Sequence, residues 1–319
     1  MRIAFTWHPF NVNWNHGAAV LSAICNQSGI ETELVPLHEG FTGIGFDWVC
    51  CSFVTVHDYL ASVSIVSKIE VPKIAGGVYA RKGGRIEGFD HVCRGEGSTL
   101  VDFFLHGDTT VFDKPMLDTD INIMPDYSSV TGYEFGRGLP WLEGRKLVPY
   151  SHSRGCPYQC SFCEVRNLDQ RIRIKTNIKQ DLRQLGHYNP DLFYFTDELL
   201  PYYNRGWREQ MEGNQVPFLC FIRGDIQPSH LDFLIDNGAA SVVMGVESGD
   251  EQYRNNQLNK RLTDKQLYRT VKQLDKRGVH RLTLFMRNTP GETNEMRDAT
   301  YDMVETLGGD SIIFEYEAL

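Results

Sequence analysis

Residues 154–163 read R-G-C-P-Y-Q-C-S-F-C and place three cysteines, Cys156, Cys160 and Cys163, in one short loop. Their spacing, C-x3-C-x2-C, gathers three thiolates that together can hold a small inorganic ion or cluster. A [4Fe-4S] cluster held by three cysteines keeps one iron without a protein ligand, and a small molecule can bind and be reduced there. The rest of the chain is organised around this loop.

Two other interpretations of the cysteines stay open at this point. With His152, four residues upstream of Cys156, they would complete a Cys3His zinc site, which is normally a closed structural site. Alternatively, they are separate core residues, since free cysteine is often buried as a small hydrophobic side chain. The spacing favours the cluster, and the neighbouring elements of the chain must decide between the three.

The motif resembles the signature of the radical S-adenosylmethionine (SAM) enzymes, in which an aromatic residue, here Phe162, precedes the last cysteine. The resemblance implies a [4Fe-4S] cluster on Cys156, Cys160 and Cys163, whose open iron chelates the amino and carboxylate groups of SAM. One electron from the cluster then cleaves SAM to methionine and a 5'-deoxyadenosyl radical. In such enzymes the protein positions the cofactors and excludes water. A reducing partner such as flavodoxin or ferredoxin would supply the electron.

The composition is that of an ordinary globular protein with two domains. The 319 residues exceed one typical domain, no apolar run reaches the length of a membrane span, and the first six residues read as a strand and not as a secretory leader. Eight cysteines without a small disulfide scaffold predict a reducing cytoplasm. The net charge of -9 disfavours unspecific binding to nucleic acid or anionic lipid. We interpret the basic stretch 166–175 as a solvated face beside the cysteine loop.

Strand and helix patterns alternate through the second half of the chain. The predicted strands are residues 147–153, 192–196, 218–223, 241–246, 281–286 and 311–316, and the predicted helices are 178–186, 206–211, 228–237, 265–277 and 292–307. Right-handed βα units of this kind build a barrel or an open arc of one, and six of them match the partial (β/α)6 barrel that the resemblance implies. The cysteine loop then follows the first strand at the carboxyl-terminal mouth, where barrels keep their active sites. This context favours a cluster over zinc.

Polar residues stand at the ends of the next two strands. Asp197 and Glu198 follow the second strand and resemble the acidic motif that receives the SAM ammonium, through charge-assisted hydrogen bonds. Arg223 ends the third strand, and its planar fork suits a carboxylate. Taken alone, each acidic residue is as well explained as a helix N-cap or a surface charge. Their recurrence at successive strand ends favours a shared site.

The fourth and fifth strands add two more motifs. The sequence G-V-E-S-G contains Gly245, Glu247 and Ser248, and the resemblance implies that Glu247 accepts hydrogen bonds from the ribose of SAM with support from Ser248. After the fifth strand, R-N-T-P-G-E-T resembles the family's G-x-P-G-E-T, with Asn288 in place of the first glycine. We therefore expect the backbone to approach the nucleoside differently at Asn288. The P-G-E-T residues explain the start of a helix equally well.

The first third of the chain predicts a parallel, doubly wound, Rossmann-like sheet. Strand patterns at residues 2–7, 31–36, 48–56, 73–75 and 91–94 alternate with helical patterns at 18–26, 59–69 and 100–105. The continuous apolar run of 48–56 is typical of a strand buried on both faces. Ligands of such sheets bind at the carboxyl ends of the strands, where two glycine-containing turns lie, at 76–77 and 95–97. Glycine there indicates that the backbone approaches something closely.

These two turns, in I-A-G-G-V-Y-A and R-G-E-G-S-T-L, resemble the cobalamin-binding domain that precedes many radical SAM barrels. Gly76, Gly77, Gly95, Glu96 and Gly97 carry the similarity. No D-x-H-x-x-G occurs in the chain, so no histidine is offered as a lower axial ligand of cobalt, although family members often bind cobalamin without one. A fold retained after loss of the corrin is the alternative. A dinucleotide site is disfavoured, because no G-x-G-x-x-G follows the first strand.

We thus expect three segments: a cobalamin-binding-like domain at 1–110, a linker rich in Asp, Pro and Gly at 111–140, and a radical SAM partial barrel at 141–319. Relatives commonly continue beyond the sixth strand with a closing segment, so we expect a minimal member or a sixth strand covered by a partner. The reaction expected from the resemblance is methyl transfer to an unactivated carbon or to phosphorus by way of methylcobalamin. A corrin-independent radical cyclisation, rearrangement or oxidation is the first alternative. A non-catalytic iron–sulfur or corrin-binding partner protein is the second.

Overall fold

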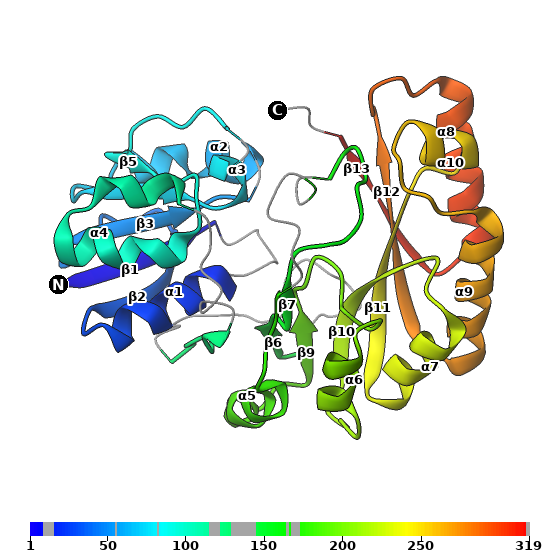
Figure 1. The fold of residues 1–319 in the computed structure, drawn as a ribbon. Helices are drawn as coiled ribbons and strands as arrows, with labels where there is room; N and C mark the ends of the chain where they lie inside the picture. The colour runs from blue at the N-terminus through cyan, green and yellow to red at the C-terminus, as the bar shows by residue number, and fades with distance from the viewer. Residues whose placement is uncertain are drawn as a thin grey trace. The chain divides into compact units, whose positions relative to one another are not determined.

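The computed structural model describes residues 1–8, 16–54, 56–81, 83–114, 122–128, 145–163, 166 and 173–316. These residues form two compact units, Met1–Lys146 and Leu147–Ala318, and each unit is an α/β structure built on a parallel sheet (Figure 1). In the described parts of the chain, no helix is both long and apolar enough to cross a membrane.

The first unit contains a five-stranded parallel sheet in the order β2-β1-β3-β4-β5, the order of one common doubly wound fold. Its strands are β1 (Arg2–Trp7), β2 (Glu31–Pro36), β3 (Trp48–Ser52), β4 (Lys73–Gly76) and β5 (His91–Val92). Its helices are α1 (His16–Gln27), α2 (Val56–Val66), α3 (Val78–Arg81), α4 (Leu100–His106) and the 3-10 turns η1 (Gly97–Thr99) and η2 (Thr109–Asp113).

Both faces of this sheet are covered, and the side-chain alternation of β1 shows how. Ile3, Phe5 and Trp7 point into a core formed with α1 and α4, whereas Ala4 points into a second core formed with α2 and α3. The apolar run that starts at Trp48 is explained in the same way, because Cys50 packs in the first core and its two neighbours pack in the second.

The second unit contains a six-stranded parallel sheet in the order β13-β12-β11-β10-β9-β6. Its strands are β6 (Leu147–Tyr150), β9 (Leu192–Phe195), β10 (Phe218–Arg223), β11 (Ala239–Glu247), β12 (His280–Arg287) and β13 (Asp310–Glu315). The connections contain α5 (Ile178–Leu185), η6 (Gly186–Tyr188), α6 (Arg205–Met211), α7 (Pro228–Asp236), α8 (Glu251–Asn256), α9 (Asp264–Arg277) and α10 (Asn294–Leu307). Because the strands follow one another in chain order, their carboxyl ends form one continuous rim (Figure 1).

Three differences from the sequence prediction have local causes. The strand predicted at 48–56 ends at Ser52, since Val56 already begins α2. The strand predicted at 147–153 divides into β6 and the two-residue β7 (Ser153–Arg154), which pairs antiparallel with β8 (Arg173–Ile174). Within the predicted linker, Asp126 and Tyr127 contact α1, because the Asp126 N–H donates to the Ala19 carbonyl across 3.0 Å. The boundary expected near residue 140 lies outside the described residues.

Candidate active site

The cysteine loop begins where β7 ends. Gly155 starts it with a φ of 92°, a left-handed backbone conformation that suits glycine. Cys160 is buried, whereas Cys156 and Cys163 are half-buried, and the N–H of Cys163 donates to the carbonyl of Cys160 across 3.1 Å. Burial raises the pKa of the Cys156 thiol, so a metal that binds it must displace a proton. The loop offers three sulfur ligands from one tight turn.

The arrangement suits a cluster better than a single ion. His152, the fourth ligand in the zinc interpretation, is fully buried among aromatic rings, with the centroids of Phe195 and Tyr150 4.0 and 4.9 Å from its own. A set of thiolates alone is the donor set that iron–sulfur clusters use.

A segment that follows α8 holds the cysteine loop. We call residues 257–263 the bracket segment. The backbone N–H of Ser161 donates to the carbonyl of Leu258 across 2.9 Å, and the Ser161 hydroxyl donates to the carbonyl of Gln257 across 2.7 Å. The chain between the second and third cysteines is therefore fixed by hydrogen bonds to residues almost a hundred positions away.

Asn259 adds a third contact, because its side-chain amide donates to the carbonyl of Gln159 across 2.6 Å. Asn259 and Arg261 have φ values of 50° and 54°, so the bracket segment curls through two left-handed residues. Sequence reasoning missed this segment. It follows a helix of only six residues, too short for hydrophobic periodicity to reveal.

Arg223 contacts the loop from the end of β10. Its Nη1 lies 3.7 Å from Sγ of Cys160, and its guanidinium carbon lies 3.7 Å from the centre of the Tyr158 ring. Asp225 and the carbonyl of Lys260 bind the same guanidinium, at 3.1 and 2.5 Å. Sequence analysis predicted a partner for the SAM carboxylate here. The geometry instead favours a cation that offsets the charge of a thiolate at Cys160.

Glu247 stands at the end of β11 in a left-handed conformation, with φ of 75°, beside a register shift between Gly245 and Glu247 against β12. For a residue other than glycine this conformation costs about 1–3 kcal/mol, and such strain clusters at functional sites. The Glu247 carboxylate pairs with Nζ of Lys260 at 2.8 Å, and both side chains are almost buried. Nζ of Lys260 also lies 5.6 Å from the centre of the Phe162 ring, at cation–π distance. Lys260 was not identified from the sequence.

The carboxylate of Asp197 is surrounded by donors of the protein itself. Its carboxylate is 1% exposed, and it accepts the backbone N–H of His152 at 3.1 Å and both the N–H and the hydroxyl of Ser153 at 2.5 Å. These bonds hold the chain between β6 and the cysteine loop. Because its oxygens are already occupied by protein donors, the geometry favours a positioning role over binding the SAM ammonium.

Glu198, the next residue, is better placed for a ligand. Its side chain is 24% exposed, one oxygen accepts the N–H of Gly155 at 3.2 Å, and the other lies 3.8 Å from Nη1 of Arg154. Glu198 therefore presents a partly exposed carboxylate at Gly155, the residue that precedes Cys156. Both acidic residues therefore contact the chain that leads into the cysteine loop, and Glu198 is the more exposed of the two.

Ser248 and Asn288 take local roles. Ser248 is 1% exposed, and its hydroxyl accepts the N–H of Asp250 at 3.2 Å. Asn288 has a φ of 62°, a conformation that asparagine tolerates well, and its N–H donates to Glu292 at 2.6 Å. Asn288 thus takes a left-handed backbone conformation that glycine also adopts readily. The threonine of P-G-E-T, Thr293, caps α10.

The glycines of the first unit have reasons within their own unit. A Cβ at Gly77 would collide with the backbone of Phe53, and one at Gly95 would collide with the backbone of Lys114. A Cβ at Gly97 would lie 2.9 Å from the side chain of Leu21. Only at Gly76, among these four, would a methyl group meet ordinary space, with Cys93 3.8 Å away. Glu96 pairs with Arg81 at 3.1 Å.

Residues 150–304 match the model of the Radical SAM superfamily. The chain therefore carries a radical SAM domain over most of its second unit, and such a domain implies a [4Fe-4S] cluster and SAM as cofactors. The expectation from the cysteine motif is confirmed at this level.

A curated relative is cytidylyl-2-hydroxyethylphosphonate methyltransferase of Streptomyces wedmorensis, 23% identical over 207 residues, which are 60% of this chain and 38% of that protein. The chain thus spans well under half the length of this relative. Among solved structures, the radical SAM methyltransferase TsrM from Kitasatospora setae, with tryptophan and a SAM analogue bound, is similar with a TM-score of 0.76 at 14% identity, over 98% of this chain and 72% of that one. The cobalamin-dependent SAM radical enzyme OxsB is similar with a TM-score of 0.60 at 16% identity, over 95% and 52%. These likenesses extend the α/β fold to both units.

Proposed function

We propose that this chain is a cobalamin-dependent radical SAM methyltransferase, with a Rossmann-like corrin-binding domain at 1–110, a linker at 111–140 and a partial (β/α)6 barrel at 141–319. The observation that carries the proposal is the rim of the second sheet, where the cysteine loop, Glu198, Arg223 and Glu247 stand at successive strand ends. The fold shared with TsrM and OxsB supports the corrin assignment, because both relatives are cobalamin enzymes.

Within this proposal, Cys156, Cys160 and Cys163 hold the cluster as thiolates. When bound, the cluster supplies the electron that cleaves SAM, and the corrin carries the methyl group. Arg223 holds its positive charge 3.7 Å from the sulfur of Cys160, where it offsets the negative charge of a thiolate ligand.

Glu198 and Glu247 are the proposed SAM contacts of this chain. Glu198 is partly exposed next to Cys156, where the SAM ammonium would approach, and a carboxylate there forms a charge-assisted hydrogen bond. Glu247, paired with Lys260 and adjacent to the Phe162 ring, offers an acceptor for ribose hydroxyls. Asp197 stays outside this set and orients the chain that leads into the loop.

The corrin would bind at the carboxyl end of β4 and β5 in the first unit, where a Cβ at Gly76 would make only ordinary contacts with Cys93. Packing within the unit requires glycine at Gly77 and Gly95, where a Cβ would meet backbone, so the presence of these two glycines alone does not argue for a ligand. This observation keeps the corrin-independent radical enzyme as the second candidate function.

The test is anaerobic reconstitution with iron and sulfide, followed by absorbance and electron paramagnetic resonance with and without SAM, and by gel filtration with hydroxocobalamin. We expect a reduced cluster signal that SAM perturbs, and a corrin that elutes with the protein. Replacing each of the three cysteines by alanine should abolish the signal. Matched C220A, at a buried cysteine in β10, should leave it intact.

The outcomes separate the candidates. A perturbed cluster without retained corrin would favour the corrin-independent enzyme. A cluster that SAM does not perturb would favour a non-catalytic iron–sulfur partner protein, and zinc without iron would contradict the proposal.

A further inference from the structure

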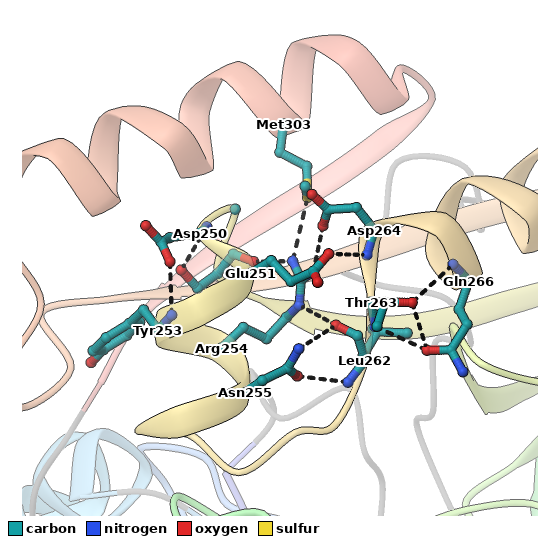
Figure 2. Close-up of polar contacts among 12 residues, drawn as sticks. Asp250, Glu251, Tyr253, Arg254, Asn255, Leu262, Thr263, Asp264, Gln266 and Met303 are labelled. Carbon is teal, nitrogen blue, oxygen red and sulfur yellow. Dashed lines mark hydrogen bonds and ion pairs between the residues drawn. The ribbon is translucent and has the colours of Figure 1, made fainter.

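Arg254 is a fully buried arginine that belongs to none of the strand-end motifs. It lies on the short helix α8, with a side chain that is 0% exposed, and Figure 2 shows it at the centre of a set of polar contacts. A buried guanidinium must satisfy its donors inside the protein, so its partners reveal what it holds.

Those partners lie at the far end of the bracket segment and just after the end of β11. Nε donates to the carbonyl of Leu262 across 2.9 Å, and Nη2 donates to Asp264 across 2.5 Å (Figure 2). Nη1 donates to the carbonyl of Ser248 across 2.7 Å. The carbonyl of Arg254 itself accepts the N–H of Lys260 at 3.0 Å. One residue thus joins the strand end after Glu247 to the far end of the bracket segment.

Asn255 strengthens the same junction. Its side-chain oxygen accepts the N–H of Leu262 at 2.7 Å and its amide donates to the carbonyl of Leu262 at 3.2 Å. Asp264 in turn accepts from Arg254 and donates its N–H to Glu251 at 2.6 Å. The bracket segment is therefore hydrogen-bonded to α8 at Leu262, and its other end is hydrogen-bonded to the cysteine loop at Ser161.

We propose that Arg254 is a positioning residue, which sets the shape of the cysteine loop and the place of Lys260 by fixing the bracket segment. The physical path has three steps. Arg254 and Asn255 fix Leu262 and Lys260, and the segment then presents its carbonyls to Ser161. Lys260 pairs with Glu247 through Nζ, and its backbone carbonyl accepts from the guanidinium of Arg223. Residues that hold metal ligands from a distance typically change affinity by about 10–100-fold when replaced.

This inference rests on the proposed function, because it concerns the loop to which the cluster is assigned. Arg281 provides a matched control. It is another nearly buried arginine of the second unit, but it lies at the amino end of β12. Its guanidinium donates to the carbonyl of Leu307 and pairs with Asp275 at 2.9 Å. Replacing it disturbs a similar number of buried bonds without touching the bracket segment.

The experiment compares R254K, N255A and R281K with the wild-type chain. The first readout is hydrogen exchange of the apo protein. We expect the amides of Ser161, Lys260 and Leu262 to exchange on the order of tenfold faster in R254K and N255A, with no change in R281K. The second readout is the cluster: iron content after reconstitution, and the SAM concentration that half-converts the electron paramagnetic resonance signal, which should rise about tenfold in R254K and N255A.

N255A removes no buried charge, so it keeps the test valid if R254K folds poorly. Equal exchange at Ser161 in N255A and R281K, together with equal iron content and SAM response, would overturn the proposal. A wild-type chain that takes up no cluster would instead refute the proposed function, and the exchange data on the apo protein would still decide the positioning role of Arg254.

Discussion

Nζ of Lys260 lies 2.8 Å from a carboxylate oxygen of Glu247, and a methyl group added at Gly245 would collide with that same oxygen. The ion pair therefore lies over the backbone of β11 in space that only a glycine leaves open. One partner belongs to a strand end and the other to the bracket segment, so the pair connects two parts of the rim that the sequence separates by 13 positions.

Two glycines of the same motif should respond differently to alanine. In G245A the new methyl group meets only the ends of two flexible side chains, with Nζ of Lys260 at 2.9 Å, whereas in G249A it meets the backbone at Ala299 and Thr300. We expect G245A to keep nearly wild-type thermal stability but to bind SAM on the order of tenfold more weakly. We expect G249A to lose about 2–4 kcal/mol of unfolding free energy, because backbone must shift. Denaturant unfolding measures the stability of the two variants, and SAM titration measures the SAM affinity of G245A. Equal stability of the two variants would contradict the prediction.

Removing one member of the ion pair should be more harmful than removing both charges. K260M leaves an almost buried carboxylate without its cation, which costs about 3 kcal/mol of stability. E247Q combined with K260M should recover most of that loss, since no uncompensated charge is then left. The measurement is a double-mutant cycle of unfolding free energies. Additive losses would mean that the two side chains do not interact in solution.

The strands of both sheets could be predicted from sequence, and their reasons are local. The run that became β10 is apolar at every position but its last, the run that became β2 alternates glutamates with Thr32 and Leu34, and the predicted limits of both match the structure. The three cysteines could be predicted as one site because they lie within eight consecutive residues. Failures occurred where an element was short: α3 and α8 span four and six residues, less than two helical turns.

The candidate site was harder to predict, because its contacts cross the sequence. The sequence around Lys260 does not predict its contact with Glu247. The one available signal is that a positively charged residue follows the G-V-E-S-G motif. Asp197 and Glu198 could not be told apart from sequence. The structure separates them, because the Asp197 carboxylate is buried against the amides of His152 and Ser153, whereas the Glu198 side chain is 24% exposed.

That division of roles predicts opposite effects for two conservative substitutions. In D197N one carboxylate oxygen becomes an amide NH2 group. This donor must then face some of the N–H and hydroxyl donors that the carboxylate accepts in the wild type. It should lose about 2–3 kcal/mol of stability and take up less iron. E198Q should fold and take up iron like the wild type, but SAM should no longer perturb the cluster signal. If D197N instead folds normally and loses only the SAM response, Asp197 is a ligand and the positioning role is wrong.

A buried lysine behind the loop predicts how stability depends on pH. Burial lowers the pKa of Lys175 to about 8, and the carboxylate of Asp181, 3.8 Å away, offsets only part of that effect. Between pH 8 and about 10.5 the unfolded chain therefore holds a proton at Lys175 that the folded chain has released. The contribution of Lys175 to stability must therefore rise with pH in this window, by up to about 3 kcal/mol. Below pH 8 this contribution no longer changes with pH.

The effect of Lys175 must be measured as a difference between variants, because buried cysteines change stability with pH in the opposite direction. Burial raises the pKa of Cys51, for example, to about 12. We expect the unfolding free energy of the wild type minus that of K175M to grow between pH 8 and 10. The same difference for K179M, at an exposed lysine on α5, should stay constant. Denaturant titrations at fixed pH values supply both curves. Parallel curves for the wild type and K175M would show that Lys175 keeps an ordinary pKa, and hence that water reaches its ammonium group in the folded chain.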